Sequence, residues 1–158
     1  MIEYQTGDIL EADAQALVNS VNCVGVMGKG IALQFKRKFP QNFRAYEKVC
    51  KNDALKPGRV FVHDRGALFA SDQAPRYIVN VPTKTHWRRP SELAYIEAGM
   101  EALVDEIQQR GIASVAIPPL GCGNGGLEWE RVEAIIQHHM QAVPATRVVL
   151  YPPGAYSG

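Results

Sequence analysis

Short runs of apolar residues alternate along the chain with longer segments whose apolar positions recur every three or four residues. The short runs are rich in β-branched residues and end at turn-forming residues, which is typical of strands. They predict strands at Ile2–Thr6, Ala16–Asn22, Arg59–His63, Tyr77–Val81, Ser114–Pro118 and Arg147–Tyr151. The segment from Asp64 to Arg76 is rich in turn formers and is predicted to be a surface loop or hairpin.

The longer segments predict helices at Ile31–Phe39, Phe43–Lys51, Ser91–Arg110 and Trp129–Met140. The third helix is the clearest, because one face carries apolar side chains at Leu93, Ile96, Met100, Leu103 and Ile107. Ser91 is its expected N-cap and Gly111 its expected end. Strands that alternate with helices in this way predict a layered α/β domain.

Length and charge limit the functions that the chain can have. Its 158 residues are enough for a single domain, residues 1–158, with a substantial core. Lys and Arg total 17 against 16 for Asp and Glu, so no strong overall field favours nonspecific binding to duplex DNA or anionic membranes. Any contact with nucleic acid must therefore be local.

The cysteines and the N-terminal sequence indicate an intracellular protein. Cys23, Cys50 and Cys122 are far apart and form no CxxC pair, which favours buried thiols over a disulfide framework or a zinc cluster. The N-terminus has no basic region followed by an apolar stretch, and no window approaches the length of a membrane span. We expect a cytoplasmic monomer with no membrane contact, no metal and no cofactor.

Two glycine-rich loops follow predicted strands, at the strand ends where open α/β sheets bind ligands. Gly25 to Ala32 leads into a helix, whose free backbone N–H groups can receive a phosphate. This loop is not a P-loop, because only Val26 and Met27 separate Gly25 from Gly28 and a glycine follows Lys29. The second loop, Leu120 to Gly126, also precedes a helix. Either loop alone is more often a tight turn, but the two together favour a diphosphate ligand.

The segment from Asn80 to Arg88 brings four kinds of reactive or binding side chain to the end of an apolar strand. Lys84 supplies an amine, His86 an imidazole, Trp87 an indole and Arg88 a guanidinium. A nucleotide sugar can use all four. The alternative is a set of solvated charges beside an indole packed under the next helix.

The order of four motifs resembles that of a macrodomain, the ADP-ribose-binding fold. These motifs are Gly7-Asp8-Ile9, the strand end at Val18–Asn22, the loop Gly28–Ala32 and the loop Gly121–Gly123. The resemblance covers nearly the whole chain. It implies a three-layer α/β/α fold with a mixed, mostly parallel sheet, and ADP-ribose in a cleft across the strand ends.

Within that superfamily, three segments resemble the macrodomain of DarG antitoxins, namely Met27–Phe35, Pro82–Arg88 and Gly121–Trp129. DarG domains remove ADP-ribose from thymine bases in DNA that the partner toxin DarT has modified. A human terminal ADP-ribose glycohydrolase is the next relative by resemblance, and it also has a lysine at the position of Lys84. The implied substrate is therefore ADP-ribosylated DNA.

The resemblance assigns roles in ADP-ribose binding to particular residues. Asp8 accepts a hydrogen bond from the adenine amino group, Ile9 offers its backbone N–H, and Asn22 lies beside the distal ribose. Tyr151 is a weaker candidate for stacking on adenine. Backbone donors and neighbouring groups around the diphosphate and distal ribose are expected from Gly28, Lys29, Gly30, Ile31, Thr83, Pro119, Leu120, Gly121, Cys122, Gly123, Asn124 and Gly125. Without the resemblance, Asp8 is a turn residue, Asn22 caps the next loop and Tyr151 is a packing residue.

Lys84 and Asn22 are the catalytic residues that the resemblance implies. As an amine, Lys84 can attack the anomeric carbon and form a ring-opened covalent intermediate; as an ammonium, it can stabilise or protonate the departing base. The human enzyme has a catalytic aspartate in the second glycine loop, where this chain has Gly125. A covalent route here needs another proton carrier, such as His86 or water.

His86, Trp87 and Arg88 are expected to face the modified DNA. Trp87 is a candidate for stacking on a flanking base and Arg88 for binding a phosphate, the usual division of roles in single-stranded DNA binding. Lys29 and Arg89 extend this local basic patch.

Three functions remain open from the sequence. The chain is a hydrolase acting on ADP-ribosylated thymine, a noncatalytic ADP-ribose-binding module, or a hydrolase of another linkage such as a carboxylate ester, a guanine adduct or O-acetyl-ADP-ribose. It is either a stand-alone enzyme or a domain excised from a longer antitoxin, in which case a DarT-type toxin is its partner.

Overall fold

The computed structural model describes residues 2–67 and 75–154. Its sheet has the strand order β1-β6-β5-β2-β4-β3. The strands are β1 (Ile2–Tyr4), β2 (Ala16–Val21), β3 (Phe61–Asp64), β4 (Tyr77–Pro82), β5 (Ser114–Ile117) and β6 (Arg147–Leu150). Each neighbouring pair is parallel except β3 and β4, which are antiparallel. The expected mixed, mostly parallel sheet is thus confirmed.

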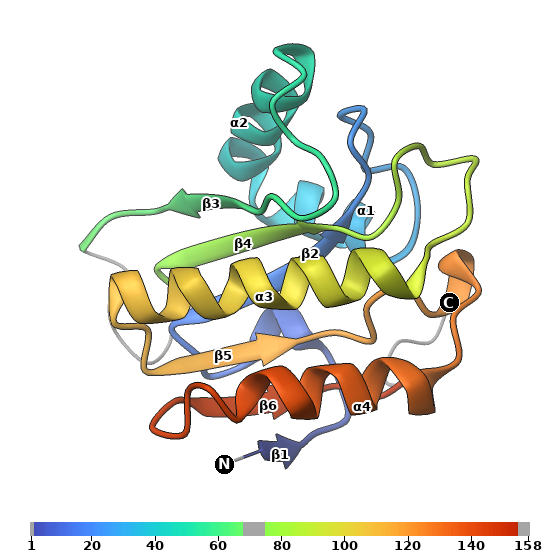
Figure 1. Ribbon diagram of the computed structural model, residues 1–158. Coiled ribbons are helices and arrows are strands. Elements are labelled where there is room, and N and C mark those ends of the chain that lie inside the picture. Colours follow the sequence, from blue (N-terminus) through green and yellow to red (C-terminus); the bar gives the residue numbers. More distant parts are fainter. Residues whose placement is uncertain (1, 68–74, 155–158) are drawn as a thin grey trace.

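Helices cover both faces of this sheet (Figure 1). They are α1 (Gly30–Lys38), α2 (Pro40–Lys51), α3 (Leu93–Arg110) and α4 (Trp129–Met140), with short 3-10 turns η1 (Ile9–Glu11) and η3 (Gly123–Gly125). Helices α3 and α4 lie on one face, and α1 and α2 on the other. This is the three-layer α/β/α arrangement expected from the sequence.

Alternating strand residues separate the core into two faces. In β2, Ala16 and Val18 pack with the residues of α3 and α4, whereas Leu17 packs with Ile9 and with Phe35 of α1. The same alternation occurs in β4, β5 and β6. Because successive side chains point to opposite faces and both faces are covered, these strands appear in the sequence as nearly continuous apolar runs.

Asn80 is a buried residue of β4 rather than part of a functional segment. Its side-chain amide donates to Asn42 Oδ1 of α2 at 2.9 Å and to the Phe61 carbonyl of β3 at 3.1 Å, and its Oδ1 accepts from Asn19 Nδ2 at 3.4 Å. Buried amides need such partners, because an unpaired polar group in a core is costly. The set attaches α2 to the centre of the sheet.

Most predicted elements match the structure to within one or two residues, with informative differences at helix starts. Helix α2 begins at Pro40 instead of Phe43, because proline fits the first helical turn, where its missing N–H costs nothing. Helix α3 begins at Leu93 with Glu92 as N-cap, so the prediction that Ser91 caps it is wrong. The Ser91 backbone N–H donates instead to the Gly125 carbonyl at 3.1 Å.

The predicted loop or hairpin at Asp64–Arg76 connects two antiparallel neighbours, β3 and β4, although residues 68–74 lie outside the described residues. Within the described residues, Cys23, Cys50 and Cys122 are free thiols. None of the helices in residues 2–67 and 75–154 is both long and apolar enough to cross a bilayer.

Candidate active site

A cavity of about 710 Å³ lies where β2, β4 and β5 end, between the two glycine-rich loops. That volume is in the range of small-molecule and cofactor sites. Its lining includes most of the residues expected to bind a ligand, namely Asn22, Gly28, Lys29, Gly30, Ile31, Thr83, Lys84, Trp87, Pro119, Gly121, Cys122, Gly123, Asn124 and Gly125. It also includes residues that were not among those expected to bind a ligand, namely Ser20, Val21, Val26, Ala32, Gln34, Ser91, Pro118, Pro153 and Gly154.

Asn22 organises the loop that follows β2. Its Oδ1 accepts hydrogen bonds from the backbone N–H of Val24 at 3.0 Å and from the Tyr46 hydroxyl at 2.8 Å, and its Nδ2 donates to the Val26 carbonyl at 2.7 Å. Burial raises the pKa of Tyr46, so its hydroxyl remains a neutral donor. Asn22 therefore caps the loop and also lines the cavity, while its place beside a ribose stays a prediction.

The first glycine loop delivers the start of α1 to the cavity. Lys29 precedes the helix in an extended conformation, and Gly30 has a φ of 56°, a left-handed conformation that favours glycine. The N–H groups of a first helical turn have no partner within the helix, and the helix dipole adds partial positive charge there. This end of α1 suits a phosphate group.

Backbone hydrogen bonds within the second glycine loop hold it in a compact conformation. The Leu127 N–H donates to the Gly121 carbonyl at 3.0 Å, and the Gly126 N–H donates to the Gly123 carbonyl at 3.1 Å. A Cβ on Gly121 would lie 2.6 Å from Leu127 Cδ1, and the residue has a φ of 73°, so only glycine fits. The two glycine loops face each other, since a Cβ on Gly30 would lie 3.8 Å from Asn124 Nδ2.

Lys84 reaches from the end of β4 to the second glycine loop. Its Nζ donates to the Asn124 carbonyl at 3.1 Å, and its side chain is partly buried. Thr83, directly before it, shares a 2.8 Å hydrogen bond with the Ser20 hydroxyl of β2. The backbone of this segment is held as well, because the Cys23 N–H donates to the Thr85 carbonyl at 3.3 Å. A primary amine is thus fixed at the junction of the cavity wall and the loop.

Ser91 and Gly125 pack against each other beside this amine. A Cβ on Gly125 would lie 2.3 Å from Ser91 Oγ and 2.9 Å from Ser91 Cβ, so residue 125 cannot carry a side chain while Ser91 is present. This contact gives a physical reason for glycine at position 125. A carboxylate from residue 125 is therefore not part of this site.

The three expected DNA-facing residues form a small stack at the cavity mouth. The Arg88 guanidinium lies 4.6 Å from the centre of the Trp87 ring, and the His86 ring lies 5.0 Å from it. His86 Nδ1 accepts a hydrogen bond from the Arg88 N–H at 3.1 Å. Trp87 is 46% exposed, so the indole is not packed under α3, and it lines the cavity where His86 and Arg88 do not.

Four of the expected ligand-binding residues lie outside the cavity lining. Asp8 is exposed and accepts the Leu10 N–H at 3.0 Å as the cap of η1, while Ile9 and Leu120 are fully buried. Tyr151 is 2% exposed, and its hydroxyl donates to Gln5 Oε1 at 3.1 Å. Its ring packs in the core with Ile9, so the structure presents it as a packing residue.

The thiols near the cavity are poor candidates for a nucleophile. Burial raises the pKa of Cys122 to about 11. Burial, with nearby Cys50 and Asp53, also raises the pKa of Cys23 to about 11. Only a thiolate is a strong nucleophile, and these groups are neutral near pH 7. Among the described residues, no three His, Cys, Asp or Glu side chains gather into a metal-binding group.

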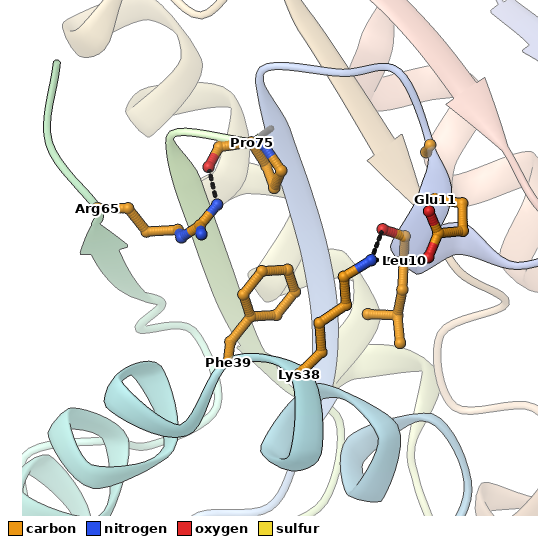
Figure 2. Close-up of a pocket in the computed structure, with 7 residues that line it drawn as sticks. Leu10, Glu11, Lys38, Phe39, Arg65 and Pro75 are labelled. Carbon is orange, nitrogen blue, oxygen red and sulfur yellow. Dashed lines mark hydrogen bonds and ion pairs between the residues drawn. The ribbon is translucent and has the colours of Figure 1, made fainter. Parts of the chain in front are cut away.

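A second, smaller cavity of about 120 Å³ lies beside η1 and the end of α1 (Figure 2). Its cations are engaged within the protein, because Lys38 Nζ donates to the Leu10 carbonyl at 2.9 Å and to Glu11 Oε1 at 2.8 Å. Arg65 donates to the Pro75 carbonyl at 2.6 Å and lies over the Phe39 ring. The larger cavity is therefore the better candidate for a ligand site.

Residues 18–136 match the family model of the Macro domain. The chain belongs to the macro domain family. A curated relative from Mycobacterium tuberculosis, named DNA ADP-ribosyl glycohydrolase, is 55% identical over 157 residues, which are 99% of this chain and 44% of the relative. This macro domain thus spans less than half the length of that relative.

Two solved structures and a human relative are also similar to this macro domain. The structure titled "Macrodomain of Mycobacterium tuberculosis DarG" has a TM-score of 0.93 and 56% identity, covering 98% of this chain and 99% of that one. "Thermosipho africanus DarTG in complex with ADP-ribose" has a TM-score of 0.83 and 33% identity, covering 96% of this chain and 42% of that one. The human ADP-ribose glycohydrolase OARD1 is 29% identical over 144 residues, covering 89% of this chain and 85% of that relative.

The Ser91 contact predicts how glycine substitutions differ in effect. Gly125→Ala should lower the free energy of unfolding by about 1–3 kcal/mol, because the new methyl overlaps Ser91. Gly28→Ala should change it by less than about 0.5 kcal/mol, because the nearest atom to its Cβ, Val26 Cγ1, lies at an ordinary 3.6 Å. Urea unfolding of the two variants measures both values. Equal stability of the two variants would contradict this packing.

Proposed function

We propose that this macro domain removes ADP-ribose from thymine bases in single-stranded DNA, with Lys84 as the catalytic residue. The observation that carries the proposal is the Lys84 amine, held 3.1 Å from the Asn124 carbonyl beside a cavity of nucleotide size. The names of the M. tuberculosis relative and of the ADP-ribose complex from Thermosipho africanus support the substrate class.

In this proposal ADP-ribose lies along the cavity with its diphosphate between the two glycine loops. The first turn of α1 and the backbone of Gly121–Gly125 supply N–H donors for the phosphate oxygens. Asn22 and Lys84 line the same cavity, which supports a pose with the distal ribose and the bond to be cleaved near both side chains. The modified base then projects toward Trp87 at the cavity mouth.

The reaction exchanges a carbon–nitrogen bond for a carbon–oxygen bond. The bond between the anomeric carbon and the thymine nitrogen breaks, water supplies the new oxygen, and one water proton ends on the thymine. As an ammonium, Lys84 stabilises the departing base and the charge that develops on it. As an amine, it takes the place of the base at the anomeric carbon, and water later releases ADP-ribose from the resulting imine.

We also propose that the domain works in the cytoplasm as a monomer, and against a DarT-type toxin when it is part of a longer antitoxin. The similarity to the Thermosipho africanus DarTG structure supports the toxin partner. The near balance of 17 basic and 16 acidic residues supports a local DNA contact over a broad electrostatic one.

Substitution of Lys84 should separate catalysis from binding. Lys84→Ala should reduce release of ADP-ribose from an ADP-ribosylated thymidine oligonucleotide by roughly 100-fold or more, because the acid or nucleophile is lost. Its affinity for free ADP-ribose should stay within about threefold of wild type, since the glycine loops carry most of the binding. Chromatographic product analysis and calorimetry measure the two quantities. Unchanged hydrolysis in Lys84→Ala would show a noncatalytic lysine.

Lys84→Arg is the matched control, because arginine keeps the charge and the donors but forms no imine. Substantial activity in this variant favours the electrostatic role, whereas activity as low as in Lys84→Ala favours the covalent one. A parallel assay on an ADP-ribosylated carboxylate ester, a guanine adduct and O-acetyl-ADP-ribose ranks the other linkages. Faster turnover of any of these than of the thymine adduct would overturn the proposed substrate.

Arg88 should contribute to DNA binding without affecting ADP-ribose. Arg88→Ala should raise KM for the modified oligonucleotide by roughly threefold to tenfold and lower the slope of log K against log salt by about 0.7, the loss of one phosphate contact. Arg110→Ala removes a cation at the C-terminal end of α3, whereas Arg88 precedes the N-terminal end, and it should leave KM and the salt slope unchanged. Steady-state kinetics over a salt series test this. Equal effects of the two substitutions would exclude a specific phosphate contact by Arg88.

A further inference from the structure

The Ser91 hydroxyl is a buried polar group at the cavity whose role the protein fold alone does not explain. Ser91 is 5% exposed, and within residues 2–67 and 75–154 its Oγ has no hydrogen-bond partner. A hydroxyl can both donate and accept, and leaving both capacities unused in a buried place is unfavourable. A role in catalysis is one of the explanations for such a group in a site wall.

The hydroxyl lies against Gly125 and belongs to the same cavity wall as Lys84. A Cβ on Gly125 would lie 2.3 Å from Ser91 Oγ and 3.9 Å from Lys84 Cε, so both side chains lie next to residue 125. Because glycine has no side chain, the Ser91 hydroxyl can occupy the space where a side chain of residue 125 would lie. Any larger residue there would separate the serine from the lysine.

Lys84 has donors to spare for such a contact. Its ammonium carries three N–H groups, and the Asn124 carbonyl accepts one of them at 3.1 Å. The flexible end of a lysine side chain can move its nitrogen between neighbouring acceptors. Asn124 lies in the second glycine loop and Ser91 directly before α3, and both line the same cavity as Lys84.

We propose that Ser91 is a positioning residue for Lys84, whose ammonium donates to the Ser91 hydroxyl when ADP-ribose occupies the cavity. The inference rests on the proposed catalytic role of Lys84. It accounts for three observations together: the unpartnered hydroxyl, the glycine that its position requires, and the placement of both beside the lysine. Ser91 acts through Lys84 and need not touch ADP-ribose.

Ser91→Ala tests the positioning role in the full chain. It should lower kcat on the modified oligonucleotide roughly tenfold, the effect of one hydrogen bond to a charged group, while KM and the affinity for ADP-ribose stay the same. In the Lys84→Ala background the same substitution should cause no further loss. Reduced ADP-ribose affinity with unchanged kcat, or an equal loss of hydrolysis in both backgrounds, would overturn the proposal.

A readout that needs no hydrolysis distinguishes failure of this inference from failure of the proposed function. With ADP-ribose bound, an amine-reactive reagent should label Lys84 of Ser91→Ala roughly twofold to tenfold faster than Lys84 of wild type, each relative to exposed Lys51 at the end of α2, because an acceptor that stabilises the unreactive ammonium is lost. Peptide mass spectrometry measures both sites. An unchanged ratio of the two rates contradicts the contact, whether or not the protein is a hydrolase.

Thr146→Val is the matched control for removal of a buried hydroxyl. Thr146 Oγ1 donates to the Ile112 carbonyl at 3.3 Å, at the ends of β5 and β6 opposite the cavity. This variant should lose thermal stability and keep the wild-type kcat, whereas Ser91→Ala should keep its melting temperature and lose kcat. A fall in melting temperature of Ser91→Ala as large as that of Thr146→Val would assign Ser91 a structural role instead.

Discussion

The parallel pairing of β2 with both β4 and β5 is the constraint on which the whole site depends. Residues 16–21 of β2 pair with residues 77–82 of β4, and Ala16 and Leu17 pair with Val115 and Ala116 of β5. Since these strands run in the same direction, their carboxyl ends meet at one edge of the sheet. Asn22, Lys84 and the second glycine loop therefore come together although about 100 residues separate the first from the last.

Close packing of the backbone around Ser91 then orients the side chains at this edge of the sheet. Gly121 and Gly125 both press against Ser91, and the Ser91 N–H holds the Gly125 carbonyl, so the second glycine loop is bound to the start of α3. The Asn124 carbonyl of the same loop accepts from Lys84. A backbone carbonyl of a hydrogen-bonded loop thus orients the amine toward the cavity edge, and charged groups oriented in advance favour electrostatic catalysis. A carboxylate partner in this loop has no space beside Ser91.

The sequence predicted much of this arrangement, and the failures have physical causes. Short apolar runs rich in β-branched residues identified the six strands of the described residues, and the two glycine loops located most of the cavity. The N-cap prediction for Ser91 failed because a local serine signal competed with a contact to Gly125, 34 positions away and invisible to local rules. Gln34 and Pro153 gave no signal, because only the folded chain turns them toward the cavity. Tyr151 was a candidate for stacking because it ends a strand, but position at a strand end does not predict whether a side chain is buried, and Tyr151 is buried.

The central claim is that this domain cleaves the bond between ADP-ribose and thymine at a site centred on Lys84. The most direct measurement is mass spectrometry of a thymidine-ADP-ribosylated oligonucleotide after incubation with the wild-type domain. Our account predicts two products, free ADP-ribose and the oligonucleotide with its thymine intact. Recovery of the unchanged adduct with ADP-ribose-binding affinity intact, or of an oligonucleotide that has lost the base, would contradict it.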